Sequence, residues 1–220
     1  MQICASHIDL LQDTYNDDSH KNTTCNNRGH GVRHQVKPET KVPKNWPDFL
    51  QNSSNKEELF ALLGRHVLSN STMPIVTNIG SIFHVSSSHE SITSLHNSSY
   101  HNFIEEADGR LILHANDMVL HGVEHILICS CDTDVVVLVV SFFHKLRSKG
   151  LKNLWIFYGV GQNQKYIPVH QKGEKLGVKK AKVLRGFHAF TGCDTVSAFA
   201  SKEKQCLECL KCIRRCHCSV

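Results

Sequence analysis

The sequence lacks the hydrophobic runs that mark export or membrane insertion. Its first residues, MQICASHIDLLQDTY, contain no basic segment, no sustained apolar stretch and no small-residue cleavage site, so we expect no secretory signal. No segment approaches the roughly 18 consecutive apolar residues of a membrane-spanning helix. We therefore predict an intracellular protein, nuclear or cytoplasmic, with no membrane partner and with its ten cysteines reduced.

Aromatic residues and charge of one sign are also scarce. Aromatic residues make up 7% of the 220 residues, and 25 Lys and Arg against 20 Asp and Glu give a formal net charge of +5. This weak basic bias permits a nucleic-acid partner without requiring one. The apolar fraction of 40% suffices for one sizeable core, and nothing in the sequence indicates the oligomeric state.

Two common catalytic signatures are missing as well. Gly159 and Gly161 are not followed by the Lys-Ser/Thr pair of a phosphate-binding P-loop, so we expect a turn there. No Gly-x-Ser-x-Gly nucleophile elbow is present, and no internal repeat is visible.

Composition divides the chain into three parts. Residues 1–45 are polar and typical of a mobile loop, apart from a short apolar segment at 3–12 that suits a strand or a helix. Residues 46–204 hold the periodic apolar segments of one domain, and residues 205–220 form a Cys-rich tail.

Apolar periodicity predicts alternating helices and strands in the second part. The segment 133–150 is ambiguous, and we favour a helix with Thr133 or Asp134 near its N-cap and Gly150 beyond its end. This alternation indicates an α/β fold with a mainly parallel sheet flanked by helices. Helices are expected over 48–68 and 103–122, one or two helices over 173–192, and strands over 74–79, 81–85, 125–132, 151–159 and 164–170.

Carboxylates gather at the ends of these predicted elements. Asp132 and Asp134 directly follow the strand 125–132, and ligands of parallel sheets sit at the carboxyl ends of strands. Carboxylate oxygens suit Mg²⁺ or Mn²⁺, and two such ions can promote phosphodiester cleavage. The alternative is that one Asp caps the next helix and the other faces water. Further acidic candidates stand at helix starts or after strands: Asp13, Glu106, Asp108 and Asp194.

A basic run precedes the last of these acids. Residues 172–185 carry five Lys and one Arg, among them Lys179, Lys180 and Arg185. Such a run is ordinarily a solvated helix face, but beside an acidic metal site it can follow a phosphate backbone.

Three motifs make the chain resemble a known group. EEAD, CDTDVVVL and FHAFTGCDTVSAF are similar to the patterns EEADT, DTDVxVL and HALTGCDTxSAF of a largely uncharacterised group of transposon-associated animal proteins. KVPKNWPDFL also looks like that group, and the resemblance covers roughly residues 8–204. More distantly, the group resembles PIN-like and flap-endonuclease nucleases.

That distant resemblance implies a Rossmann-like, PIN-like fold and an acidic two-metal site. It implies a divalent-metal-dependent nuclease-like domain of mobile-element origin, acting on DNA or RNA phosphodiesters with Mg²⁺ or Mn²⁺. The alternative is a catalytically inactive PIN-like module that binds nucleic acid or protein. The implied metal ligands and catalytic residues are Glu106, Asp108, Asp132, Asp134 and Asp194, with Asp13 as a further ligand and Arg28 and Arg33 as phosphate contacts.

The chain also departs from the pattern. The strand and metal-binding Asp that flap-type nucleases carry upstream of the position of Asp13 look absent, so we expect an N-terminally truncated domain. Gly109 replaces the Thr of EEADT, and SKEK at 201–204 replaces a turn rich in Gly and Lys. These departures favour the inactive alternative for this chain.

Cysteine and tryptophan complete the set of candidates. Cys206, Cys209, Cys212 and Cys216 have ferredoxin-like spacing, which leaves open a metal-free tail, a zinc site with His217 or an iron–sulfur site. We expect Cys129, Cys131 and Cys193 to pack in the core as small hydrophobic residues. We expect Trp46, Trp155 and Phe187 to be core or lid aromatics.

Overall fold

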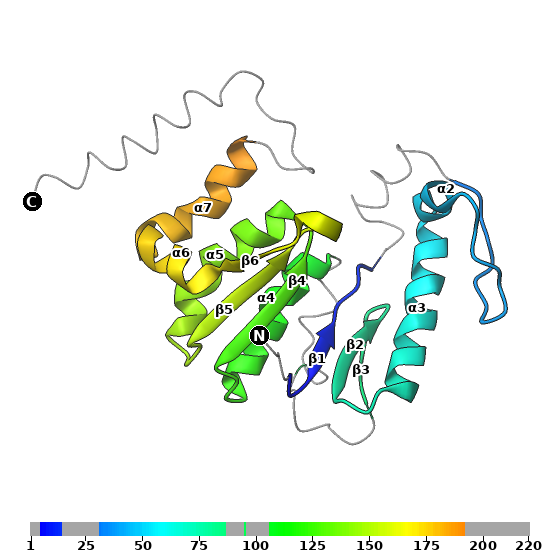
Figure 1. Ribbon diagram of the computed structural model, residues 1–220, viewed down its shortest axis with the longest axis horizontal. Helices are drawn as coiled ribbons and strands as arrows, with labels where there is room; N and C mark the ends of the chain where they lie inside the picture. The colour runs from blue at the N-terminus through cyan, green and yellow to red at the C-terminus, as the bar shows by residue number, and fades with distance from the viewer. Residues whose placement is uncertain (1–4, 15–30, 87–94, 96–105, 192–220) are drawn as a thin grey trace, which may run out of the picture. The chain divides into compact units, whose positions relative to one another are not determined.

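The computed structural model describes residues 5–14, 31–86, 95 and 106–191, which belong to two compact units, residues 1–121 and 122–220 (Figure 1). The boundary falls inside the segment 46–204 that the sequence suggests is one domain. Unit 1 contains β1 (Ile8–Leu10), α2 (Trp46–Gln51), α3 (Ser53–Asn70), β2 (Ile75–Ile79), β3 (Ile82–Val85) and α4 (Ala107–Leu120). Unit 2 contains β4 (His125–Ser130), α5 (Thr133–Arg147), β5 (Asn153–Tyr158), β6 (Lys165–Pro168), α6 (Val169–Leu176) and α7 (Val178–Thr191).

Unit 1 is built on a small mixed sheet in the order β1-β2-β3. β1 pairs with β2 in parallel, and β2 and β3 form an antiparallel hairpin through Gly80, whose φ of 59° favours glycine. α3 packs on β2, where Gly64 permits a close approach because an added Cβ would lie 3.3 Å from Ile79. The ambiguous segment 3–12 is thus a strand at its centre.

One predicted helix of unit 1 is two helices. The chain breaks at Asn52, whose backbone is extended and whose side chain accepts the N–H of Asn55 as the N-cap of α3. Asn45 caps α2 in the same way, with Pro47 in its first turn. Because Asn and Pro are typical of helix starts, this local chemistry divides the apolar stripe predicted over 48–68.

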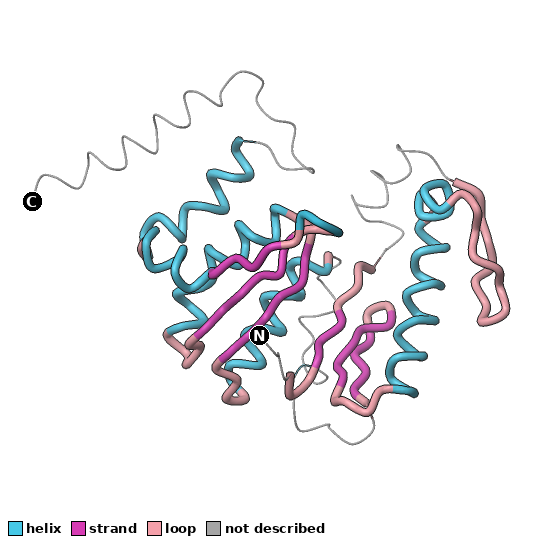
Figure 2. The backbone as a smooth tube through the Cα atoms, viewed as in Figure 1, coloured by secondary structure: helices cyan, strands magenta, loops and turns pink. Residues whose placement is uncertain are grey.

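Unit 2 has a second mixed sheet in the order β4-β5-β6 (Figure 2). β4 and β5 are parallel over their whole lengths, and β6 returns antiparallel along β5, with Pro168 on the edge strand as predicted. α5 packs against α6 and α7, and its buried residues Val139 and Phe143 belong to the core with Leu154 and Ile156 of β5.

Several expectations can now be compared with the structure. The α/β class, the helix after residue 132 and the strands at 75–79, 82–85, 125–130 and 153–158 are confirmed. The described sheets are mixed rather than mainly parallel, since each has one parallel and one antiparallel pair. None of the described helices is long and apolar enough to cross a membrane.

Candidate functional site

The carboxyl edge of β4 and β5 carries the two central carboxylates. β4 ends at Ser130, and the extended backbone of Asp132 places this residue at the N-cap of α5. Asp132 Oδ1 accepts the N–H of Asp134 at 2.7 Å, while Ser130 Oγ accepts the N–H of Asp132 at 3.0 Å. The chain thus presents both carboxylates at the sheet edge, and the capping role considered for one Asp belongs to Asp132.

α7 adds a histidine to this edge that the sequence pattern does not reveal. His188 Nε2 donates to Asp134 Oδ1 at 2.7 Å, and both side chains are partly exposed. The imidazole provides a partner for the Asp134 carboxylate, and this answers the need for compensation where two acids adjoin a core. His188 lies on the same helical face as buried Ala181 and half-buried Leu184, and this spacing is the signal that points it inward.

The end of β5 contributes hydroxyl and cationic groups. Tyr158 Oη lies 3.2 Å from Thr133 Oγ1, and the Lys165 ammonium lies 5.6 Å from the centre of the Tyr158 ring. The N–H of Gly159 donates to the carbonyl of Ser130 at 3.3 Å and so links the ends of the two parallel strands. The edge therefore combines carboxylates, hydroxyl groups, an imidazole and a lysine.

Positive charge is concentrated in unit 2. Residues 122–191 hold eleven Lys and Arg against four Asp and Glu, a net charge of +7, whereas the whole chain has +5. On α7, Lys179 and Arg185 are exposed and Lys180 is half-buried, and the Arg185 guanidinium lies 4.4 Å from the centre of the Phe142 ring. This charge favours an anionic partner.

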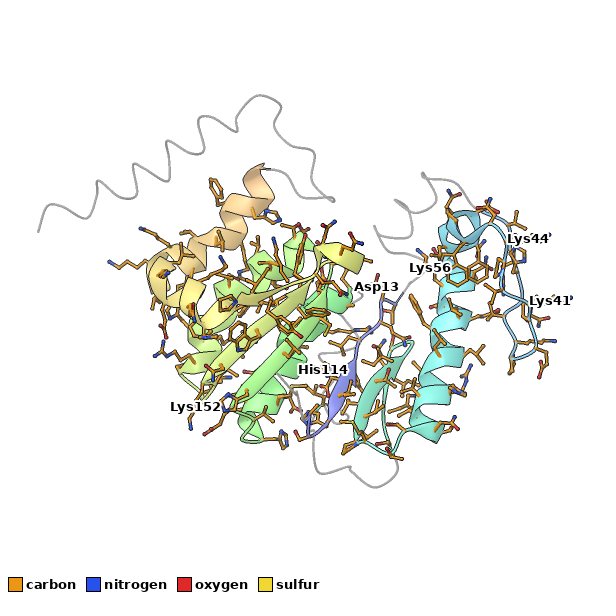
Figure 3. All side chains as sticks on the ribbon, viewed as in Figure 1. Asp13, Lys41, Lys44, Lys56, His114 and Lys152 are labelled. Atoms are coloured by element: carbon orange, nitrogen blue, oxygen red, sulfur yellow. The ribbon has the colours of Figure 1, made fainter. Side chains whose placement is uncertain are left out.

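The remaining described acidic candidates lie in unit 1. Asp13 Oδ1 accepts the N–H of Ala107 at 2.8 Å, so a residue just after β1 caps the start of α4 (Figure 3). Glu106 is the N-cap residue of α4, and Asp108 is in its first turn. The structure therefore brings Asp13 to the start of α4 and, within unit 2, Asp132 to Asp134. Asp194 and Arg28 lie outside the described residues.

A buried polar network below Asp13 also escapes sequence reasoning. Arg110 of α4 donates to the Gln12 carbonyl at 3.1 Å and to Thr14 Oγ1 at 2.9 Å. One turn later, His114 (Figure 3) donates through Nδ1 to Asp9 Oδ2 at 2.6 Å, and the two side chains are 2% and 8% exposed. Arg110, His114 and Asp117 recur at helical spacing along α4 and are all buried. This spacing in the sequence indicates a polar stripe on one face of the helix. The resemblance suggests that a strand with a metal-binding Asp is missing upstream of Asp13. The structure has a short strand before Asp13, β1, which carries Asp9.

Arg33, proposed as a phosphate contact, is engaged by its own unit. Its guanidinium forms an ion pair with Glu58 and donates to Asn55 Oδ1 at 3.1 Å. The pKa of the Glu58 carboxyl is lowered, chiefly because this group accepts the N–H of Val36. Burial acts in the opposite direction and raises the pKa, and Arg33 lowers it further. These contacts attach the segment 32–36 to α3.

The expectation that Cys129 and Cys131 pack in the core is wrong. Cys129 and Cys131 are exposed, because along β4 the buried positions are Ile126 and Ile128 and the cysteines alternate with them. Of the aromatics expected in a core or a lid, Trp46 is 40% exposed. Trp155 is half-buried, with His170 at its edge. Cys193 and the tail cysteines Cys206, Cys209, Cys212 and Cys216 lie outside the described residues.

Asp132 and Asp134 are the carboxylates at the edge of unit 2 that could hold a magnesium-type cation. Among the described residues, no group of three or more His, Cys, Asp or Glu is arranged to hold a metal ion. Mg²⁺, however, is commonly held by one or two carboxylates together with waters and substrate phosphates, and Asp132 and Asp134 supply two. Comparison of the chain with protein-family models, with curated proteins and with solved structures gives no match.

Proposed function

We propose that this chain is a divalent-metal-dependent, nuclease-like protein of mobile-element origin that acts on phosphodiesters of DNA or RNA. One observation carries the proposal: a two-residue turn presents Asp132 and Asp134 together at the carboxyl edge of a parallel strand pair. The net charge of +7 over residues 122–191 supports a polyanionic substrate.

Each side chain at the edge has a defined task in this proposal. Asp132 and Asp134 would hold Mg²⁺ or Mn²⁺, which when bound supplies an activated water and neutralises phosphate charge. The cap bond fixes Asp132, and His188 orients Asp134. Lys179, Lys180 and Arg185 would contact phosphates, and the first turn of α5 adds the positive end of its dipole.

The same contacts favour a second candidate, a catalytically inactive module that binds nucleic acid. His188 already satisfies Asp134 without a cation. Among the described residues, two carboxylates rather than three or more converge at the edge of unit 2. In this second candidate the basic residues of α7 retain their contacts with phosphates and no bond is cleaved.

A cleavage and binding assay separates the two candidates. Labelled single-stranded DNA, branched DNA and RNA are incubated with Mg²⁺ or Mn²⁺ and the full chain, the variant Asp132→Asn/Asp134→Asn, or the control Glu124→Gln/Glu174→Gln. Asn retains the cap, and the control removes two carboxylates of the same unit that form ion pairs with Lys152 and Arg147. We expect metal-dependent cleavage that falls about 100-fold or more in the first variant only.

Other outcomes are equally informative. Binding without cleavage by all three proteins supports the inactive module. Cleavage that persists in Asp132→Asn/Asp134→Asn contradicts the proposed site, and the absence of both cleavage and binding contradicts both candidates.

A further inference from the structure

The loop that precedes α2 in unit 1, taken together with the first two residues of α2, is exposed and basic. From Lys37 to Pro47 every residue except Pro43 is exposed, and the loop carries three lysines against the single acid Glu39. Three of the five prolines of the chain lie within these eleven residues. Because proline fixes the backbone angle φ, the loop loses less conformational entropy when a partner binds.

Both ends of this loop are attached to helices although its centre is exposed. Buried Asn55 accepts the N–H of His34 at 2.8 Å and donates to the carbonyls of Val32 and Phe49 at 2.8 and 3.0 Å. At the other end, Asn45 Oδ1 accepts the N–H of Asp48 at 3.3 Å as the cap of α2. Lys41 and Lys44 therefore lie on a segment of defined position (Figure 3).

Trp46 ends the loop as a supported, partly open aromatic ring. Its ring stacks on Phe49, with centroids 5.2 Å apart and planes inclined by 19°, and Phe49 is 2% exposed. Phe49 covers one side of the indole while 40% of Trp46 stays exposed. An aromatic ring held in this way is a platform on which a planar group can stack without reorganisation of the protein.

The exposed ring of Trp46 beside Lys41 and Lys44 favours one class of anionic partner over another. An acidic peptide would satisfy Lys41 and Lys44 but would offer no planar group to Trp46, whereas each nucleotide of a single strand carries both a phosphate and a base. We propose that the segment Lys37–Trp46 binds single-stranded nucleic acid, with a base stacked on Trp46 and phosphates held by Lys41 and Lys44. This inference rests on the proposed function for the class of partner, but it involves neither Asp132, Asp134 nor a metal ion.

The direct test uses the fluorescence of Trp46. The chain has two tryptophans, so Trp155→Phe leaves Trp46 as the only indole. Titration of this protein with a single-stranded dT12 oligonucleotide in EDTA should quench the fluorescence in a saturable manner. The quench should be the same after the additional change Asp132→Asn/Asp134→Asn, which separates this site from the edge of unit 2.

Affinity measurements then assign the roles of the residues. By anisotropy of labelled dT12, Trp46→Leu should weaken binding at least about fivefold, whereas Trp46→Phe should restore most of it. The plot of log affinity against log salt has a negative slope, and Lys41→Gln/Lys44→Gln should make it less steep by about 1.4, since each phosphate contact on a single strand contributes about 0.7. The control Lys149→Gln/Lys152→Gln, with the same change of charge, should leave the slope unchanged.

Four results would overturn the inference. These are the absence of a quench by dT12, equal affinity of Trp46→Leu and wild type, equal losses in the two lysine pairs, and a quench of the same size by polyglutamate. Circular dichroism and thermal unfolding of each variant identify a loss of binding that comes from misfolding. If both Trp46 variants are folded, binding that is retained in Trp46→Phe and lost in Trp46→Leu supports the stacking role.

Discussion

The imidazole of His188 lies 2.7 Å from the carboxylate of Asp134, and this bond joins the end of α7 to the start of α5. The two residues are separated by 54 positions in the sequence, and α5 and α7 pack against each other. The bond has two consequences. It orients the carboxylate at the edge of the sheet, and it attaches a basic helix to the same edge.

The first prediction concerns the strength of this bond. Removal of either partner, by His188→Ala or Asp134→Asn, should lower the free energy of unfolding by about 1 kcal/mol or less, because both side chains are partly exposed. Chemical unfolding of both single variants and of the double variant should give a coupling energy of about 0.5–1 kcal/mol. Strict additivity of the two changes would show that the contact contributes nothing to stability.

The second prediction concerns the contact between α5 and α6. An added Cβ at Gly173 would lie 2.4 Å from Cδ1 of Phe143, which is fully buried, so Gly173→Ala should destabilise the protein by about 1–3 kcal/mol. Gly186 on α7 is the matched control, since an added Cβ there meets nothing within 4 Å. Gly186→Ala should be neutral or stabilising by up to about 1 kcal/mol. Equal thermal shifts in the two variants would contradict the packing described for Gly173.

The third prediction concerns the buried pair in unit 1. His114→Ala removes the 2.6 Å donor of the Asp9 carboxylate, whose side chain is 8% exposed, and leaves it the 3.5 Å contact with His7; the expected loss in unfolding free energy is about 3 kcal/mol. His121→Ala is the control, because His121 is partly exposed. Its Nδ1 lies 3.6 Å from Asp117 Oδ1 and 2.9 Å from the Asp117 carbonyl, and the expected cost is below about 1 kcal/mol. Denaturant unfolding followed by circular dichroism measures both, and a similar small loss in each would contradict the assigned pair.

The fourth prediction is a pH dependence at Glu58. The N–H of Val36, and to a lesser degree Arg33, lowers the pKa of Glu58 below its ordinary value of 4.5. The stabilisation is therefore fully present above that value and is lost as the pH falls through the lower pKa of the folded protein. Because Glu58 is partly exposed, the contribution should be under about 1 kcal/mol.

The variant Glu58→Gln tests this dependence. The difference in unfolding free energy between wild type and variant should be constant above about pH 6 and should shrink as the pH falls below about 4.5. Glu39→Gln, at an exposed glutamate of the loop before α2, is the control and should show no such change. A difference for Glu58→Gln that stays constant down to pH 3 would contradict the assigned cause.

Local chemistry was sufficient to predict much of unit 2. The apolar run before Asp132, the long segment after it and Pro168 on an edge strand each depend on neighbours in the sequence, and the structure has all three. The break at Asn52 was missed because QNSSN reads equally well as the polar face of one helix and as a cap between two. Asn52 can act as an N-cap only if α2 ends before it, and the sequence does not show where α2 ends.

Long-range contacts explain what the sequence could not predict. Asp134 and Asp132 were found because a strand-to-helix turn is local, whereas His188 and the pair of Asp9 and His114 depend on packing between distant elements. The exposure of Cys129 depends on which face of β4 is covered, and an apolar run without alternation does not contain that information.

The measurement closest to the central claim is a calorimetric titration of Mn²⁺ into the full chain and into Asp132→Asn/Asp134→Asn, with Glu124→Gln/Glu174→Gln as the control. We expect saturable heat for the wild type and the control and its loss in the aspartate variant, because Asp132 and Asp134 supply the carboxylates at the edge of β4 and β5. Identical, negligible heats for all three proteins would contradict the claim and would leave these aspartates with the cap of α5 and the bond to His188 as their only roles.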